Sequence, residues 1–243
     1  MGRTFLPLVV AVTSAVCMVA LGTGLLISRI TNPTSRVLLS DEMIAPDGGI
    51  LPQRSTDPAR FTAGYAGGEY VIHVNAPFSQ GEALLPGEFA DSSIAIDGAL
   101  LNAAADQFLQ LACRSQGQGS QYRFGFRPAN GEFWITRWTE GAQVATLTST
   151  DGSKTATDMG AKVNPHSQTN HLELACEKNV ISAIVNGTIV ASVSDGTFQR
   201  GQVWIAAGET PLAARTNTST GGVHPEVPTE GHFTHLVVVE PSR

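Results

Sequence analysis

Hydrophobic and polar residues alternate in short runs along the chain from residue 61 onward. In the run EYVIHV at 69–74, for example, Tyr70, Ile72 and Val74 occupy alternate positions, as in a strand with one face in a core. Turns rich in Gly, Asn, Asp and Pro separate the runs, and no long helical periodicity interrupts them. The pattern predicts an all-β, antiparallel sandwich or barrel. About eleven runs carry it, at 69–74, 92–101, 107–114, 121–127, 132–138, 142–149, 170–177, 181–187, 188–194, 202–207 and 232–240.

Two of the connections contain an Asn-Gly pair, at 130–131 and at 186–187. Asn-Gly adopts the positive φ angles that a two-residue turn between twisted strands requires, so both pairs predict tight hairpins, over 122–138 and 180–193. Two other connections are long, at 149–170 and 208–231. Loops of that length in a compact domain are usually functional or mobile.

The first part of the chain differs from the rest, because residues 4–28 form an uncharged apolar run between Arg3 and Arg29. As a helix these 25 residues would extend roughly 37 Å, enough to cross a bilayer with some tilt. We expect a transmembrane signal anchor over 1–36 with the membrane as partner of residues 4–28, a cleaved signal peptide being the alternative. Residues 37–60 are expected to be a stalk, although LLSDEM at 38–43 could instead be a short first strand or a helical turn that docks on the domain.

The charge distribution excludes one class of partner. Beyond Arg36 the chain has 21 acidic residues and 12 basic ones (15 less Arg3, Arg29 and Arg36), a net charge of −9. Such a surface repels phosphate backbones, so no nucleic-acid partner is expected.

The cysteines indicate a cellular compartment. Cys17 lies inside the apolar run, which leaves Cys113 and Cys176 as a pair in the β-rich part. Each ends a similar segment, LQLACR or LELACE, in which Leu, Leu and Cys share one strand face. We expect a disulfide between them in an exported domain, hence a single-pass plasma-membrane protein with its C-terminal domain extracellular. Two buried free thiols in a cytosolic domain are the alternative.

The order of motifs resembles a known superfamily. QLACR, YRFGF and GEFWITRW are followed by LELAC, by AIVNGTIVASVSDGTFQRGQVWIAAG from residue 183, and by a final FTHLVV. Over 61–239 this order is similar to the concanavalin A-like lectin/glucanase jelly roll, and more narrowly to bacterial membrane-anchored extracellular modules found with 3-keto-disaccharide hydrolase-type domains. The resemblance implies a jelly-roll β-sandwich domain over residues 61–243. The chain departs from it in FTHL, which lacks the Asp of an FDNF-like strand, and in the long segment 208–231.

Catalytic and metal-binding patterns are missing from the sequence. Glucanases of this superfamily carry two carboxylates in an E.D..E strand, and no such triplet occurs here, so glycoside hydrolysis is not expected. His232 and His235 would point to opposite faces of a regular strand and could not chelate one ion together. No spacing of acidic residues supports a calcium site, and neither a metal nor a cofactor is expected.

Aromatic residues offer the best candidate for binding, because sugar rings stack on them while nearby polar groups hold the hydroxyls. We take Tyr122, Trp134, Trp138 and Arg137 as candidate ligand-binding residues, with Arg123 and Arg127 as further polar partners. The other aromatic residues of this hairpin, Phe124 and Phe126, are expected in the core. The predicted function is a membrane-anchored extracellular module that recognises a cell-wall glycan. The alternative is a protein-interaction or scaffold domain, acting on a cell-surface protein through the loop 208–231.

Overall fold

The computed structural model of the chain describes residues 35–44, 49–53, 57–102, 104–117, 119–148, 154–165, 167–209 and 228–241. The predicted membrane segment and Cys17 lie outside these residues, as does most of the loop 208–231. Among the described residues, no helix has the length and apolar character needed to cross a membrane. The strands in this part of the chain are β1 (Arg36–Asp41), β2 (Phe61–Ala66), β3 (Glu69–Val74), β4 (Gln80–Leu84), β5 (Ser92–Leu100), β6 (Gln107–Ser115), β7 (Gln121–Arg127), β8 (Glu132–Thr139), β9 (Ala142–Thr146), β10 (Asn170–Glu177), β11 (Val180–Val185), β12 (Thr188–Ser194), β13 (Gln202–Glu209) and β14 (Thr229–Glu240).

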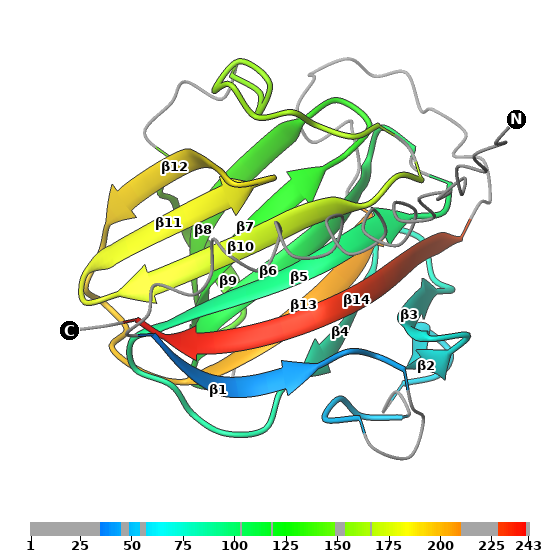
Figure 1. Cartoon of the computed structure of the whole chain (residues 1–243), viewed down its shortest axis with the longest axis horizontal. Coiled ribbons are helices and arrows are strands. Elements are labelled where there is room, and N and C mark those ends of the chain that lie inside the picture. Colours follow the sequence, from blue (N-terminus) through cyan, green and yellow to red (C-terminus); the bar gives the residue numbers. More distant parts are fainter. Residues whose placement is uncertain are drawn as a thin grey trace, which may run out of the picture. The chain divides into compact units, whose positions relative to one another are not determined.

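The strands form two antiparallel sheets that face each other, as Figure 1 shows. The eight-stranded sheet has the order β12-β11-β10-β5-β14-β3-β2, with β1 also paired to β14. The six-stranded sheet has the order β4-β13-β6-β7-β8-β9 and lies behind it in Figure 1. Neighbours in space are often distant in sequence, which is the connectivity of a jelly-roll sandwich and confirms the predicted sandwich.

The core lies between the two sheets and takes alternate residues from each strand. On β7, Phe124 and Phe126 are completely buried in it, which confirms the prediction made for both. Ile94 and Ile96 of β5, in the eight-stranded sheet, belong to the same buried cluster. The period-two alternation of the sequence therefore corresponds to a core face and an outer face on each sheet.

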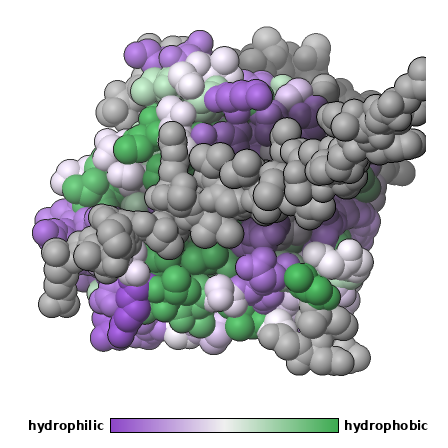
Figure 2. Space-filling view, viewed as in Figure 1, coloured by the Kyte–Doolittle hydropathy of each residue, from purple (hydrophilic) through white to green (hydrophobic). Residues whose placement is uncertain are grey.

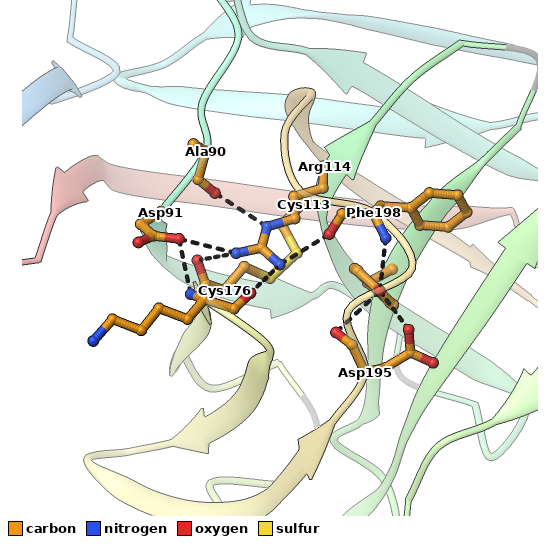
Figure 3. Close-up of a disulfide and its surroundings, with 9 residues drawn as sticks. Ala90, Asp91, Cys113, Arg114, Cys176, Asp195 and Phe198 are labelled. Carbon is orange, nitrogen blue, oxygen red and sulfur yellow. Dashed lines mark hydrogen bonds and ion pairs between the residues drawn. A yellow bond between two sulfur atoms is a disulfide. The ribbon is translucent and has the colours of Figure 1, made fainter.

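The predicted disulfide is present and joins the two sheets. Cys113 on β6 and Cys176 on β10 have Cα atoms 6.6 Å apart, and both side chains are buried. The bond thus crosses the core, linking the six-stranded sheet to the eight-stranded one (Figure 3). Closing a loop of 63 residues stabilises the folded state by about 4 kcal/mol in the chain-entropy treatment.

The residue next to this disulfide, Arg114, holds three loops together at one end of the sandwich (Figure 3). Its guanidinium is buried and donates to the carbonyl oxygens of Ala90, Cys176, Lys178 and Phe198 at 2.7–3.2 Å. It also donates to the Asp91 carboxylate at 3.1 Å. The five N–H groups of the side chain are therefore used to fix the segments before β5, between β10 and β11, and between β12 and β13.

The predicted boundary between stalk and domain needs correction. The expected stalk contains β1, which pairs with β14 from Arg36↔Glu240 to Asp41↔Leu236, so residues 36–41 belong to the eight-stranded sheet. The first-strand alternative for this segment is the one that holds.

The β11–β12 connection is the predicted two-residue turn, with positive φ at both Asn186 and Gly187.

The β7–β8 connection, by contrast, has four residues, 128–131. Arg127 pairs with Glu132, and Gly131 adopts a positive φ there whereas Asn130 does not. The Asn-Gly pair therefore ends a longer loop, and the prediction of a two-residue turn at 130–131 was wrong.

The outer face of the eight-stranded sheet carries histidines paired with carboxylates. Figure 2, which views this side of the molecule, shows hydrophilic and hydrophobic residues interspersed on it. His232 lies between Glu69 and Glu230, and Glu230 also contacts His73 at 3.0 Å. Burial lowers the pKa of His232, but the hydrogen bonds to both glutamates outweigh it and leave that pKa above its ordinary value.

A second group of this kind surrounds Asp97, which contacts both His171 and His235. The hydrogen bond to Asp97 raises the pKa of His171. His235 reaches this side of the sheet because β14 has a bulge between Thr234 and Val237, where His235 adopts a φ of 52°. His232 and His235 therefore share a face, contrary to the prediction from regular alternation, although they contact different carboxylates.

Candidate functional site

The outer face of the six-stranded sheet collects large side chains around its central strands. Successive rows across this face can be followed through the pairings, because residues opposite each other in a sheet point to the same side. One row contains Trp204 of β13, Ala112 of β6, Arg123 of β7 and Thr136 of β8. The next contains Ala206, Gln110, Gly125 and Trp134 on the same strands.

Trp134 and Trp138 lie on this outer face, both partly exposed, as two same-face positions of β8. They are four positions apart along the strand, which corresponds to about 13 Å. The Trp134 ring lies directly over Gly125, where a Cβ atom would come within 2.1 Å of the ring. Trp138 donates its indole N–H to Thr136 Oγ1 at 3.0 Å. The outer face thus presents two aromatic side chains, each held in place by a contact with the sheet itself.

Arg123 lies between aromatic rings in the middle of this face. Its guanidinium carbon is 3.9 Å from the centre of the Trp138 ring and 5.3 Å from that of Trp204. The small side chain of Ala112 separates Trp204 from Arg123 in the row and leaves room for this approach. Burial lowers the pKa of Arg123 to about 10, an effect that Glu82 partly opposes, so the side chain remains charged at neutral pH.

Arg127 forms the other end of this layer. Its guanidinium carbon is 4.8 Å from the centre of the Trp134 ring, and it donates to the Glu132 carboxylate. Burial lowers the pKa of Arg127, and the charge of Asp106 opposes that effect. Arg127 is therefore compensated by acidic neighbours on its own side of the sheet.

Tyr122 and Arg137 lie on the opposite side of the same two strands. They are paired across β7 and β8 and face the core, where Tyr122 is completely buried. Its hydroxyl donates to Asp195 Oδ1 at 2.6 Å and accepts from the Phe198 N–H at 3.0 Å. The grouping of Tyr122 with the two tryptophans as one ligand-contacting surface is therefore wrong, because its ring lies between the sheets.

Arg137 belongs to the same inner network. It donates to the Asp195 carboxylate and, at 2.9 Å, to Thr197 Oγ1. Burial raises the pKa of Asp195. The hydrogen bonds from Thr197 and Tyr122 and the charge of Arg137 outweigh that effect and leave the pKa below its ordinary value. These residues fix the β12–β13 loop, so the structure separates the four candidate residues into an inner pair, Tyr122 and Arg137, and an outer pair, Trp134 and Trp138.

Acidic side chains on the outer face are dispersed over different strands. Glu82 lies on β4 and Glu132 on β8, with β13, β6 and β7 between them. Four strand spacings of about 4.8 Å place these positions ~19 Å apart. That is well beyond the separation of about 5 to 9 Å at which two carboxylates act on one glycosidic bond. Within the described residues, no group of three or more His, Cys, Asp or Glu side chains is arranged to hold a metal ion.

Sequence reasoning missed one polar residue of this face, Gln110, whereas it named Arg123 as a polar partner. Gln110 and Arg123 are buried at 4% and 9% exposure, and neither Gln110 Oε1 nor Arg123 Nε has a hydrogen-bond partner among the described residues. Gly125, which seats Trp134, was missed as well. A signal was available in β7, where Arg123, Gly125 and Arg127 alternate with three aromatic residues and so must share the face away from the core.

Comparison with known proteins gives similarity at the level of structure. No family model matches the chain, and no curated protein matches it in sequence. A non-specific endo-β-1,3(4)-glucanase of family GH16 superposes with a TM-score of 0.57 and 13% identity, over 86% of this chain and 92% of that one. A β-glucanase from Bacillus licheniformis gives 0.54 and 11%, over 82% and 96%.

A third solved structure, a protein of unknown function with a galectin-like fold from Bacillus subtilis, gives a TM-score of 0.55 and 9% identity over 86% and 97% of the two chains. Lectin-like and glucanase structures thus share the two-sheet architecture described above. The chain has the fold of the concanavalin A-like lectin/glucanase superfamily.

Proposed function

We propose that this protein is a carbohydrate-binding module whose binding surface is the outer face of the six-stranded sheet. The observation that carries the proposal is the placement of Trp134 and Trp138 on one strand of that face, with the polar side chains of Gln110 and Arg123 beside them. Flat aromatic rings pack against the C–H faces of sugars, and buried polar groups provide directional partners for hydroxyls. The solved structures with this fold include two named as glucanases, which supports a sugar as the class of ligand.

The positions and ion pairs of the carboxylates support the binding of a sugar without its hydrolysis. Glu82 and Glu132 are too far apart to act on one glycosidic bond, and the Glu132 carboxylate forms an ion pair with Arg127. Asp106, just before β6, is likewise close enough to Arg127 to influence its pKa. A carboxylate that compensates an arginine is poorly suited to protonate a leaving group.

We further propose that residues 4–28 attach this module to a membrane, with the sandwich on the extracellular side. The support comes from the uncharged apolar run and from the disulfide between Cys113 and Cys176, since such bonds persist in oxidising compartments. Digestion of intact cells with an added protease tests the orientation. Loss of the sandwich from intact cells is expected, and its complete protection until the cells are lysed would refute it.

A glycan array followed by isothermal titration calorimetry tests the binding. The full chain is best kept in a non-ionic polyoxyethylene detergent, because residues 4–28 are strongly apolar and a sugar-headed detergent would compete for the site. We expect binding to at least one glycan, weakened at least tenfold by Trp134→Ala or Trp138→Ala.

Ile189→Ala is the matched control, since Ile189 is 60% exposed on β12 of the other sheet. It removes exposed apolar surface without touching the proposed face, so its affinity should equal that of the unmodified chain. Absence of any glycan ligand would refute the proposal, as would binding that both tryptophan variants retain in full while Ile189→Ala loses it.

A further inference from the structure

Arg123 differs from the other buried or half-buried arginines of the sandwich because it forms no ion pair with any residue that the structure describes. Arg114 contacts Asp91, Arg127 contacts Glu132, and Arg137 contacts Asp195. Among the described residues, no carboxylate lies within 4 Å of the Arg123 guanidinium, and no hydrogen bond joins it to another group. A cation that is nine-tenths buried is thus left with aromatic rings as its neighbours.

Such an arrangement costs stability unless something else compensates it. Removing a charge from water is unfavourable, and the attraction of two rings for a cation offsets only part of that penalty. Glu82 acts on Arg123 from β4, but its side chain is exposed and does not form a salt bridge with it. The missing partner is therefore an anion, and the position of Arg123 in the middle of the outer face allows a ligand to bring it.

We infer that the outer face of the six-stranded sheet selects glycans that carry a negatively charged group, with Arg123 as the residue that binds this group. The inference rests on the proposed function and specifies its ligand. A planar guanidinium matches the paired oxygens of a carboxylate or a sulfate.

Gln110 adds a second contact point one row away. Its Oε1 atom is buried and accepts no hydrogen bond within the described part of the chain, so it can accept one from a sugar hydroxyl. Gln110 and Arg123 lie diagonally on the adjacent strands β6 and β7, Gln110 in the row of Trp134 and Arg123 in the row of Trp204. One sugar ring with both a charged group and hydroxyls can reach such a pair.

Matched glycan pairs provide the test. The full chain is titrated with pectate, alginate, hyaluronan and chondroitin sulfate oligosaccharides, each beside its carboxyl-reduced or desulfated form, and with neutral β-glucan and galactan. We expect at least one acidic glycan to bind at least tenfold more tightly than its neutralised form. If carboxyl reduction lowers the affinity, the bound group is a carboxylate. If desulfation lowers it, the bound group is a sulfate.

Substitutions assign this preference to Arg123. In Arg123→Gln the ratio of affinities for the acidic and neutralised forms should fall to about 1, while Trp134 and Trp138 still provide binding to the neutralised form. Arg200→Gln is the matched control, because Arg200 is 66% exposed and pairs with Glu88 at the surface, and it should leave the ratio unchanged.

The outcomes separate the inference from the proposed function. Binding to neutral glycans alone, or a ratio that Arg123→Gln does not change, overturns the inference and leaves carbohydrate binding intact. Failure of every glycan to bind overturns both. Thermal unfolding without ligand gives an independent reading: Arg123→Gln should unfold at the same temperature as the unmodified chain or a higher one, whereas a clearly lower temperature would show that the charge is already compensated.

Discussion

Replacement of Arg114 by methionine tests how the end of the sandwich is held together. Methionine is unbranched and flexible and fills the space of the arginine stem, so the change mainly removes the guanidinium with its hydrogen-bond donors. Two of the five acceptors, the carbonyl oxygens of Phe198 and Cys176, make bonds that are buried and would lose their donor without gaining water. The acceptors on Ala90 and Lys178 are only partly buried and can be hydrated instead.

The magnitude follows from these contacts. Each buried acceptor without a partner costs about 1–3 kcal/mol, and the Asp91 carboxylate also loses its cation. Relief from burying the guanidinium offsets part of this, since burial already lowers the pKa of Arg114. We expect Arg114→Met to reduce the free energy of unfolding by about 3–5 kcal/mol, within the roughly 2–6 kcal/mol that two unsatisfied buried acceptors cost together.

Urea unfolding followed by tryptophan fluorescence measures this change. For a slope of about 2 kcal/mol/M, the midpoint should fall by roughly 1.5–2.5 M. Arg114→Lys retains the charge and up to three donors, so it should recover part of the loss. Arg200→Met is the control, because removal of an exposed ion pair changes stability by less than about 1 kcal/mol. A midpoint for Arg114→Met equal to that of Arg200→Met would refute the assignment of Arg114 as the residue that ties these loops.

Replacing Cys113 and Cys176 together by alanine should lower the free energy of unfolding by about 4 kcal/mol, and a dithiol reductant should produce a similar loss in the unmodified chain; a midpoint insensitive to reductant would contradict this. In Gly125→Ala the new methyl group would overlap the Trp134 ring, so we expect a red-shifted tryptophan emission and weaker glycan binding, and an unchanged spectrum would show that the ring does not lie there. The raised pKa of His232 means that its protonated form stabilises the fold: this contribution is complete below the ordinary pKa of about 6.5 and is lost as the pH rises through the folded-state value, so His232→Gln should flatten the decline in melting temperature above that pH.

Much of the strand pattern could be predicted because it depends only on local alternation. The disulfide was predictable for the same reason, since Cys113 and Cys176 each follow leucines on the core face of a strand. The faces of the aromatic residues were also within reach. A two-residue turn at Asn130-Gly131 would pair residue 129 with 132, whereas the actual pairing joins 127 with 132. A shift of two residues does not exchange the two faces of a strand. Either register therefore places the side chains of Tyr122 and Trp134 on different faces of the sheet.

Other features depend on partners that alternation cannot identify. The bulge in β14 turns His235 onto the same face as His232, and no composition signal marks it. The burial of Arg123 requires Trp204, about eighty residues later in the chain, and an Ala112 small enough to leave space between them. Only the sheet order, in which β13 lies next to β6, brings these residues into one row.

The arginines of the sandwich separate structural from ligand-directed chemistry. Arg114 and Arg137 hold the loop between β12 and β13, through the Phe198 carbonyl and the Asp195 carboxylate. Asp195 is therefore fully occupied by structural contacts, although its loop lies within the motif AIVNGTIVASVSDGTFQRGQVWIAAG that supports the superfamily resemblance. Arg123 makes no such contact within the described part of the chain. Substitution of Arg114 or Arg137 should therefore reduce stability first and affinity only as a consequence, whereas substitution of Arg123 should change affinity in a protein that remains as stable as before.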